Sequence, residues 1–414
     1  MSKLGIKMLA IIAVIVLVAG CNGSPQLRSQ DSKDEKNNVK VAIISATNYN
    51  DNFNIFKKSL EEHGKKVGLE LLWMDGEGNI LKQEDAIEEA AKQDVKVVVI
   101  EPVELDMIGN TIKKMQNKGI KFICLNTLPS DTGIEAYITP DFERAGEMQA
   151  QQLIKEIKDN QPVNILIIHG QKDDPIAEGI ISGSYKILQG NPIVKELWVE
   201  EIPSRDTAKA YETVKEYLAS PNPPAAVITH FSEHTEGMLK AVNELPSEER
   251  TQIITFGMGT QKAAIEAIGK GSHTGEIDFM PDLFAQLVVK AVNSLSKNEL
   301  WEYETQVENG AYNVQARFSP IRLITKENVQ LLTERMKELE KSDTKSNPNE
   351  QNKGGNSGEN DEKSQSNEAK QEDSKKKSII IIKTKDGQEF QMDISGEIES
   401  VEMKSGEKEG SEGQ

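Results

Sequence analysis

Residues 230–234 combine residue types and spacing that could form a catalytic metal site. His230-Phe231-Ser232-Glu233-His234 matches the pattern H-x-x-E-H, in which two histidines bind zinc and a glutamate acts as the base. That chemistry needs both rings one turn apart on a single helix. Here His230 ends a strand-like run and Ser232 has the residue type of a helix N-cap, so the helix begins after His230. We therefore expect no metal site, and we place His230 in a loop beside a cleft.

A second polar segment, residues 170–174, also falls short of a catalytic motif. Gly170-Gln171-Lys172-Asp173-Asp174 follows a strand-like run but lacks the glycines and the Lys-Ser/Thr of a phosphate-binding loop. The two aspartates are adjacent and point apart, which is typical of a solvated turn. The sequence also places no Ser-His-Asp or Cys-His set at convergent loop ends. We expect neither an enzyme nor a bound cofactor.

The first twenty-one residues have the composition of a secretory signal. Lys3 and Lys7 precede an apolar run over residues 8–19, which is too short to span a bilayer. The ending Leu17-Val18-Ala19-Gly20-Cys21 resembles the lipobox of bacterial lipoproteins, whose cysteine receives diacylglycerol and becomes the mature N-terminus. The resemblance implies a lipoprotein signal peptide over 1–21, lipidation at Cys21, and anchoring to the outer face of the bacterial cytoplasmic membrane. An ordinary signal peptide with a chance cysteine is the alternative.

Charge and cysteine content limit the partners of the chain. The net charge of −18 argues against nucleic acid or an anionic membrane surface as a partner. The chain has two cysteines, so lipidation of Cys21 would leave Cys124 without an intrachain disulfide partner. Cys124 lies in the strand-like run Lys121-Phe122-Ile123-Cys124-Leu125, which indicates a buried structural thiol.

The elements that must position any site alternate regularly between residues 39 and 340. Residues 22–38 are polar and read as a flexible tether. After them, continuous apolar runs such as 95–100, 121–125, 163–169 and 225–229 alternate with amphipathic helical segments such as 53–67, 142–157 and 207–218. Such runs are typical of parallel sheets covered on both faces. The sequence predicts an α/β fold with two doubly wound parallel-sheet lobes, whose strand ends would meet at a cleft.

The last part of the chain differs in composition. Residues 341–377 contain no large apolar side chain and predict a disordered linker, and 404–414 read in the same way. Residues 378–403 predict a β-hairpin, because Asp386-Gly387 joins two strand-like runs. An isolated hairpin is only marginally stable, so we expect it to pair with this chain or another; a solvated extension without a partner is the alternative.

The order of several short motifs resembles the type I periplasmic sugar-binding proteins, relatives of the ribose-binding protein. The motifs are Val97-Val98-Val99-Ile100-Glu101-Pro102, Gly119-Ile120-Lys121-Phe122-Ile123, Ile138-Thr139-Pro140-Asp141 with Ala145-Gly146, and Leu323-Ile324-Thr325-Lys326-Glu327-Asn328-Val329. The resemblance covers residues 40–340. It implies two lobes joined by three crossover strands that act as a hinge. We place these strands near 139–141, near 277–281 and within 300–318, which assigns 39–139 and 279–305 to the first lobe and 140–278 and 306–325 to the second.

The resemblance also implies a set of ligand-binding positions in the cleft. Matched residue by residue, they are Asn50, Phe53, Asn126, Thr127, Glu178, His230, Phe231, Met258 and Phe279. No arginine stands at these positions, although the sugar-binding members use arginine there. Three apolar residues of the second lobe replace polar ones. The set predicts a ligand that is less hydroxylated, and more apolar or cationic, than a pentose; a lobe that no longer binds tightly is the alternative.

Two functions follow from the resemblance and from the departures from it. In the first, the protein captures a small sugar-like or other polar solute in the cleft between the lobes and presents the closed form to an ABC importer in the membrane. In the second, it is a ligand sensor or scaffold that signals to a membrane histidine kinase or another envelope partner, which would suit the altered cleft and the appended hairpin.

Overall fold

The computed structural model describes residues 38–46, 51–158, 161–337, 377–383 and 389–395. Several segments named in the sequence analysis lie outside these ranges: the predicted signal peptide with Cys21, the tether up to residue 37, Asn50, the linker up to residue 376 and the segment 404–414. None of the helices within the described ranges combines the length and the apolar character needed to cross a membrane.

The first lobe is built on a seven-stranded sheet. Its strand order is β11-β12-β5-β4-β3-β1-β2, parallel except for the antiparallel pair β11–β12. The elements are β1 (Val39–Ser45), α1 (Asp51–Lys66), β2 (Leu69–Asp75), α2 (Ile80–Lys92), β3 (Val97–Ile100), α3 (Gly109–Gln116), β4 (Lys121–Leu125), β5 (Ala136–Pro140), α10 (Pro281–Ser296), β11 (Thr305–Asn309) and β12 (Tyr312–Ser319).

Alternate residues of the central strands bury opposite faces of this sheet. Val41 and Ile43 of β1 pack in one cluster with apolar residues of α1 and α10, and Ala42 and Ile44 pack in another with residues of α2 and α3. Cys124 of β4 belongs to the second cluster and is 0% exposed. Burial raises the pKa of its thiol, so the thiol is held protonated, as expected of a structural cysteine.

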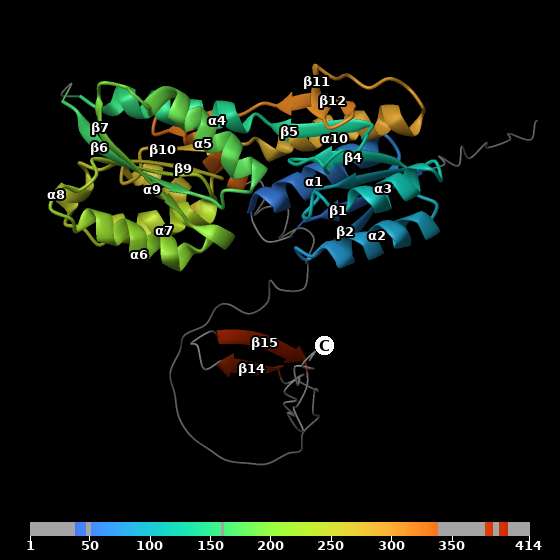
Figure 1. Ribbon diagram of the computed structural model, residues 1–414, viewed down its shortest axis with the longest axis horizontal. Helices are drawn as coiled ribbons and strands as arrows, with labels where there is room; N and C mark the ends of the chain where they lie inside the picture. Colours follow the sequence, from blue (N-terminus) through green and yellow to red (C-terminus); the bar gives the residue numbers. More distant parts are fainter. Residues whose placement is uncertain (1–37, 47–50, 159–160, 338–376, 384–388, 396–414) are drawn as a thin grey trace, which may run out of the picture. The chain divides into compact units, whose positions relative to one another are not determined.

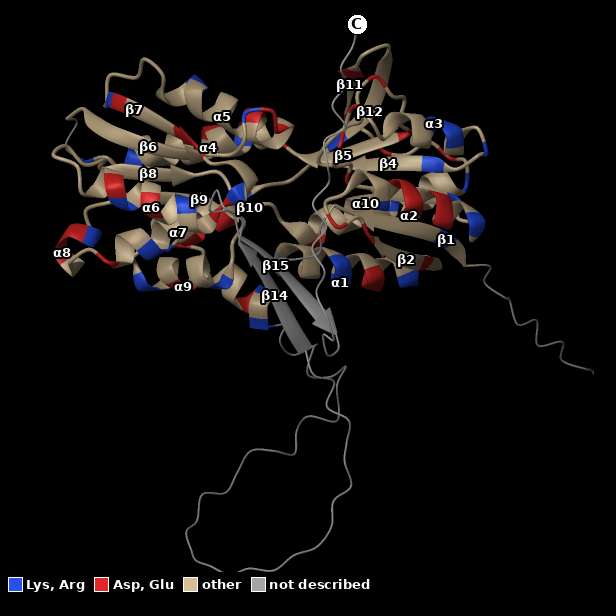
Figure 2. Ribbon diagram, turned by 60° about the horizontal axis from the view of Figure 1, so that its bottom comes forward, with Lys and Arg blue, Asp and Glu red and all other residues tan. Residues whose placement is uncertain are grey.

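The second lobe has a six-stranded sheet of order β13-β10-β9-β8-β6-β7, in which only β10–β13 is antiparallel among the described pairs. Figure 1 shows the helices on both faces of this sheet. The elements are α4 (Phe142–Glu156), β6 (Val163–His169), α5 (Pro175–Leu188), β7 (Val194–Glu201), the 3-10 turn η1 (Pro203–Arg205), α6 (Thr207–Leu218), β8 (Ala226–Thr229), α7 (Ser232–Asn243), α8 (Ser247–Arg250), β9 (Ile254–Met258), α9 (Lys262–Lys270), β10 (Gly275–Asp278) and β13 (Arg322–Thr325). Lysines and arginines alternate with acidic residues over the helices of both lobes (Figure 2).

Three crossings join the two lobes, as the resemblance implies. The chain passes from β5 to α4, from β10 to α10 and from β12 to β13. The predicted position of the third crossing and the assignment of 306–319 to the second lobe are wrong. β12 pairs in parallel with β5, with Ala316 opposite Tyr137, so this stretch extends the first sheet and the crossing follows Ser319.

Two strands near the C-terminus form a separate two-stranded sheet. β14 (Lys377–Lys383) pairs antiparallel with β15 (Glu389–Ser395), with Ile380 opposite Met392. This is the hairpin expected within residues 378–403. The Asp386-Gly387 turn between the strands lies outside the described residues.

Candidate functional site

A cavity of about 620 Å³ is lined by residues of both lobes. The first lobe contributes the residues that follow three neighbouring strands, with Ser45 at the end of β1, Glu101 after β3 and Asn126 after β4. The second lobe contributes His230 after β8 and Gly259 after β9. The cavity therefore lies at the carboxyl ends of the strands, where ligands bind in open α/β sheets.

Aromatic rings form much of the cavity wall. Six phenylalanines line it: Phe53, Phe56, Phe142, Phe231, Phe279 and Phe284. Some of these rings pack on one another, as Phe142 and Phe279 do with centroids 5.7 Å apart in an edge-to-face arrangement. Rings fixed in this way present apolar faces, and the C–H groups of a small ligand ring can pack on them.

Glu101 places a carboxyl group in the wall of the first lobe. Its Oε1 accepts a hydrogen bond of 2.7 Å from Nδ2 of Asn126, a residue with φ of 59°. Burial raises the pKa of Glu101, although the Asn126 hydrogen bond and the charge of Arg205 act in the opposite direction. The site thus contains an acceptor that would gain from a further hydrogen-bond donor.

Arg205 places a guanidinium group in the wall of the second lobe. Its Cζ lies 4.2 Å from the ring centroid of Phe231, a cation–π distance, and its Nη2 lies 3.8 Å from Oδ2 of Asp174. Arg205 and Ser204 both have left-handed φ angles, 53° and 57°. Non-glycine residues in that region store strain of about 1–3 kcal/mol each, and such residues cluster at ligand-binding sites.

Two histidine rings lie next to each other, and one of them, His230, lines the cavity. Nδ1 of His230 lies 3.4 Å from Nδ1 of His169, and Nε2 of His230 lies 3.3 Å from Oγ of Ser184. Burial lowers the pKa of His230 well below its usual value, so this ring is neutral at physiological pH. The ring of His234 instead packs edge-on against Phe231 from within α7. Among the described residues, no group of three His, Cys, Asp or Glu side chains could hold a metal ion.

The cavity brings together six of the nine positions expected to bind ligand, and their binding role stays a prediction. These are Phe53, Asn126, His230, Phe231, Met258 and Phe279. Thr127 does not line the cavity, because its side chain is buried and Oγ1 donates to the carbonyl of Pro102 at 3.1 Å. Asn50 lies outside the described residues.

Glu178 is also placed away from the cavity lining. Ile176 and Ile180, four residues apart on α5, are the lining residues of this helix. Glu178 lies between them in sequence and so faces another direction. Its side chain is exposed, and its Oε1 lies 3.9 Å from Nε2 of His169.

Arg205 and Glu101 also line the cavity, although neither was among the positions expected to bind ligand. Arg205 follows β7, whereas the matched positions follow other strands. The rule that ligands lie beyond the carboxyl ends of parallel strands would have included the loop after β7. For Glu101 the signal was its place directly after a buried run, in the segment Val97-Val98-Val99-Ile100-Glu101-Pro102.

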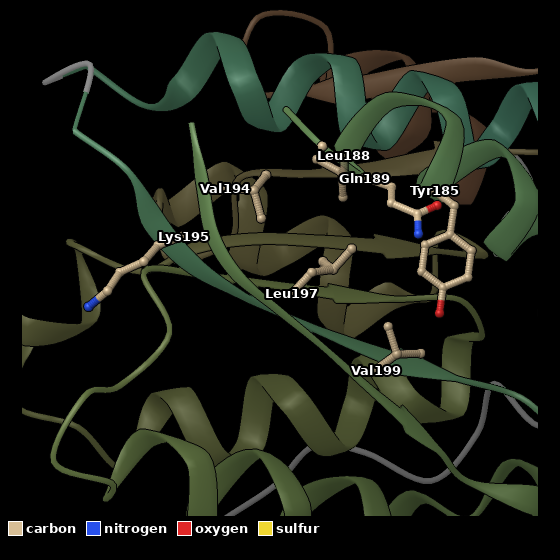
Figure 3. Close-up of a pocket in the computed structure, with 8 residues that line it drawn as sticks. Tyr185, Leu188, Gln189, Val194, Lys195, Leu197 and Val199 are labelled. Atoms are coloured by element: carbon tan, nitrogen blue, oxygen red, sulfur yellow. The ribbon is translucent and has the colours of Figure 1, made fainter. Parts of the chain in front are cut away.

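A second hollow, of about 410 Å³, lies on the second lobe alone. Figure 3 shows Val194, Leu197 and Val199 along β7, with Tyr185 and Leu188 from the end of α5 beside them. The lining residues belong to one lobe, so a ligand there would not be gripped by lobe closure. The inter-lobe cavity is therefore the better candidate for a site coupled to hinge motion.

The chain is similar in sequence to one protein family and to several sugar-binding relatives. Residues 41–300 match the family model described as a periplasmic binding protein domain. The D-xylose-binding periplasmic protein of Escherichia coli (strain K12) is 23% identical over 304 residues, which cover 72% of this chain and 89% of the relative. The ribose import binding protein of Bacillus subtilis (strain 168) is 20% identical over 294 residues, which cover 71% and 93%.

Solved structures of similar fold include two sugar or polyol complexes. A carbohydrate transporter solute binding protein from Chloroflexus aurantiacus, in complex with D-glucose, aligns with a TM-score of 0.63 at 18% identity, covering 70% of this chain and 94% of that one. The Caulobacter myo-inositol binding protein aligns with a TM-score of 0.58 at 18% identity, covering 70% and 95%.

Proposed function

We propose that this chain, which belongs to the periplasmic binding protein family, captures a small sugar-like solute outside the cytoplasm and presents it to an ABC importer. The single observation that carries the proposal is the cavity of about 620 Å³ lined by both lobes. Relatives named for binding xylose and ribose support a solute of that size and polarity.

The mechanism follows from the position of the cavity, whose lining includes Pro140 and Phe142 of the first crossing and Phe279 and Pro281 of the second. A solute that touches one lobe binds weakly, whereas closure about the hinge lets both lobes contact it at once. The solute therefore shifts the equilibrium towards the closed form by the difference between its affinities for the two forms. The closed form is what the membrane permease would recognise.

The proposal includes a lipid anchor at Cys21, which would hold the protein at the outer face of the cytoplasmic membrane. The motif Leu17-Val18-Ala19-Gly20-Cys21 supports it. Cys21→Ser removes the thiol that would carry the lipid, so the variant should be released from washed membranes, with Cys124→Ser as the matched control. A Cys21→Ser protein that stays equally membrane-bound and is equally processed would contradict the anchor.

A thermal-shift screen of the purified full chain tests the transport proposal. Xylose, ribose, glucose, myo-inositol and xylitol would each be added at increasing concentration. A solute present at 100 times its Kd should stabilise the protein by about 2.7 kcal/mol, which is readily detected. A well-folded protein that none of these solutes stabilises would contradict a sugar-like ligand, and would favour the sensory or scaffolding hypothesis.

A further inference from the structure

Glu276 is a charged residue inside the second lobe. It lies on β10 between β9 and β13, with Gly257 and Ile324 as its cross-strand neighbours, and it is 0% exposed. A buried carboxyl group is costly unless its oxygens are hydrogen-bonded, and apolar residues normally occupy such positions. The partners of Glu276 therefore indicate what the carboxyl group does there.

The two carboxyl oxygens of Glu276 meet different partners. Oε1 lies 2.9 Å from Nε2 of His273, whose side chain is also fully buried. Nδ1 of the same ring lies 2.8 Å from Oγ1 of Thr255 on β9, so both ring nitrogens have a partner. Oε2 of Glu276 accepts a hydrogen bond of 3.0 Å from the backbone N–H of Thr260. His273 thus fixes the carboxyl group, and the second oxygen holds the turn after β9.

The turn that Glu276 holds has a backbone that needs support. Gly259 has a φ of 102° and Thr260 a φ of 50°, in the left-handed region that a non-glycine residue seldom adopts. The N–H of Gly259 donates to the carbonyl oxygen of Ile277 on β10 at 3.1 Å. A residue in this region persists only when its surroundings hold it, and β10 supplies a backbone and a side-chain hydrogen bond to this turn.

The same turn contacts the first lobe. The carbonyl oxygen of Gly259 accepts a hydrogen bond of 2.6 Å from Nδ2 of Asn52 on α1. This carbonyl belongs to the peptide bond whose N–H, that of Thr260, donates to Glu276. The C=O and N–H of a trans peptide lie in one rigid plane and point in opposite directions. A carboxyl group that holds the N–H therefore also aims the carbonyl at the other lobe.

We propose that Glu276 is a positioning residue for lobe closure, because it fixes the Gly259–Thr260 peptide so that the carbonyl oxygen meets Asn52. The inference rests on the proposed function, since it concerns the hinge equilibrium by which the solute is captured. Glu276 does not line the inter-lobe cavity, so it acts on closure rather than on the solute. Without its carboxyl group the peptide plane is free to rotate, and the open form gains population.

The test measures the distance between spin labels at Lys82→Cys on α2 and Lys209→Cys on α6, in the full chain with Cys21→Ser and without solute. Glu276→Met removes both carboxyl oxygens and keeps an unbranched side chain of similar length. The ratio of open to closed protein should rise about 2- to 10-fold, which corresponds to one lost hydrogen bond. Glu276→Ala takes its place if the methionine variant does not fold.

A neutral variant and a core variant separate positioning from other effects. Glu276→Gln keeps an oxygen that can accept from Thr260, and its amide N–H can donate to Nε2 of His273 when that ring carries its proton on Nδ1. This variant should keep the ratio within about twofold of the unaltered protein. Leu188→Ala, in the buried core of the same lobe, should lower the melting temperature and leave the label distances unchanged. Opening by either variant equal to that of Glu276→Met would overturn the proposal.

A double variant tests whether Glu276 acts through Asn52. If both act on one hydrogen bond, Asn52→Ala combined with Glu276→Met should open the protein no further than Asn52→Ala alone. Two effects that multiply would overturn the proposal, as would a Glu276→Met protein that stays as closed as the unaltered one. These outcomes are measured without solute. If no solute binds while the variants behave as expected, the proposed function fails and the positioning role stands.

Discussion

Asn52 of α1 donates a hydrogen bond of 2.6 Å from Nδ2 to the carbonyl oxygen of Gly259 in the other lobe. Oγ1 of Thr260 approaches Oδ1 of the same amide at 3.5 Å. Asn52 and Gly259 both line the inter-lobe cavity, and Gly259 has a φ of 102°, which favours glycine. The two lobes are therefore tied across the cleft by a polar contact as well as by the three covalent crossings.

Removing this tie should open the unliganded protein. A hydrogen bond contributes about 0.5–1.5 kcal/mol, so Asn52→Ala should shift the open–closed equilibrium towards the open form by roughly 2- to 10-fold. Spin labels at Lys82→Cys on α2 and Lys209→Cys on α6, both exposed, would report the distance between the lobes. Asn54→Ala, an exposed position on the same helix, is the control, and equal distance distributions for the two variants would contradict the tie.

A buried aspartate at the second crossing should be important for stability. Asp278 ends β10 and is 0% exposed, and it accepts bidentate hydrogen bonds from Arg335 at 2.8 and 2.7 Å and one from Arg322 at 2.6 Å. Burial alone would raise the pKa of Asp278, but the hydrogen bonds and charge of Arg335, with Arg322, outweigh it and hold the pKa below its usual value.

Asp278→Asn should lower the free energy of unfolding by about 3 kcal/mol, because Arg322 loses its counter-charge and Arg335 keeps only Asp282, whose Oδ1 lies 3.5 Å from Nη2. Urea denaturation at pH 7 measures this loss, with Asp85→Asn on the exposed side of α2 as the control. The stabilisation by Asp278 is present above the carboxyl pKa of the unfolded chain, about 3.9, and is lost as the pH falls through the lower folded value. Equal denaturation midpoints for the two variants would show that the ion cluster is not stabilising.

The close packing of α4 on α5 depends on glycine. A Cβ added at Gly146 would meet the backbone carbonyl of Ile180, and one added at Gly183 would meet that of Glu143. Gly146→Ala should therefore destabilise the protein by about 2 kcal/mol or more, although alanine is normally the better helix residue. Gly269→Ala on α9, where no atom lies within 4 Å of the added Cβ, should leave the melting temperature unchanged or raise it. The same effect at both positions would contradict the packing argument.

The second lobe should lose stability as the pH falls below neutrality. Burial lowers the pKa of His234 to about 4, whereas the unfolded chain takes up this proton near pH 6.5. Because the pKa of His234 is lower in the folded protein than in the unfolded chain, the stabilisation linked to this residue is fully present above about pH 6.5. It is lost as the pH falls towards 4. The contribution of His234 between pH 7 and pH 5 is about 2 kcal/mol.

Urea denaturation of the unaltered protein and of His234→Gln at these two pH values isolates this contribution. The variant should lose about 2 kcal/mol less than the unaltered protein on going from pH 7 to pH 5. Parallel losses would show that the proton uptake of His234 does not differ between the folded and unfolded chains.

The fold was predictable where burial alone determines the residue pattern. Strands β3 and β6 are covered on both faces, so they are continuous apolar runs and were identified from the sequence. The hairpin of β11 and β12 was not identified, because Val314 and Ala316 are the only buried apolar residues of β12, and polar and charged residues lie beside them in the sequence.

Part of the site was predictable from positions that follow the strands of the two sheets. Phe53, Asn126 and His230 follow β1, β4 and β8 closely, and they line the cavity. Arg205 could not be matched, because it reaches the cavity from a polar turn after the edge strand β7, where an arginine looks like any surface residue. Its place in the cavity wall, over the ring of Phe231, is seen only in the structure.

The most direct test of the account measures the distance between the two lobes with and without solute. The labels at Lys82→Cys and Lys209→Cys are suited to it when Cys21 is replaced by serine, because Cys124 is buried and should not react. Saturating D-xylose or D-ribose, whichever stabilises the protein, should remove the longer label-to-label distances of the open form. Only the shorter distances of the closed form should remain. A solute that binds tightly and leaves the distribution unchanged would contradict capture by lobe closure.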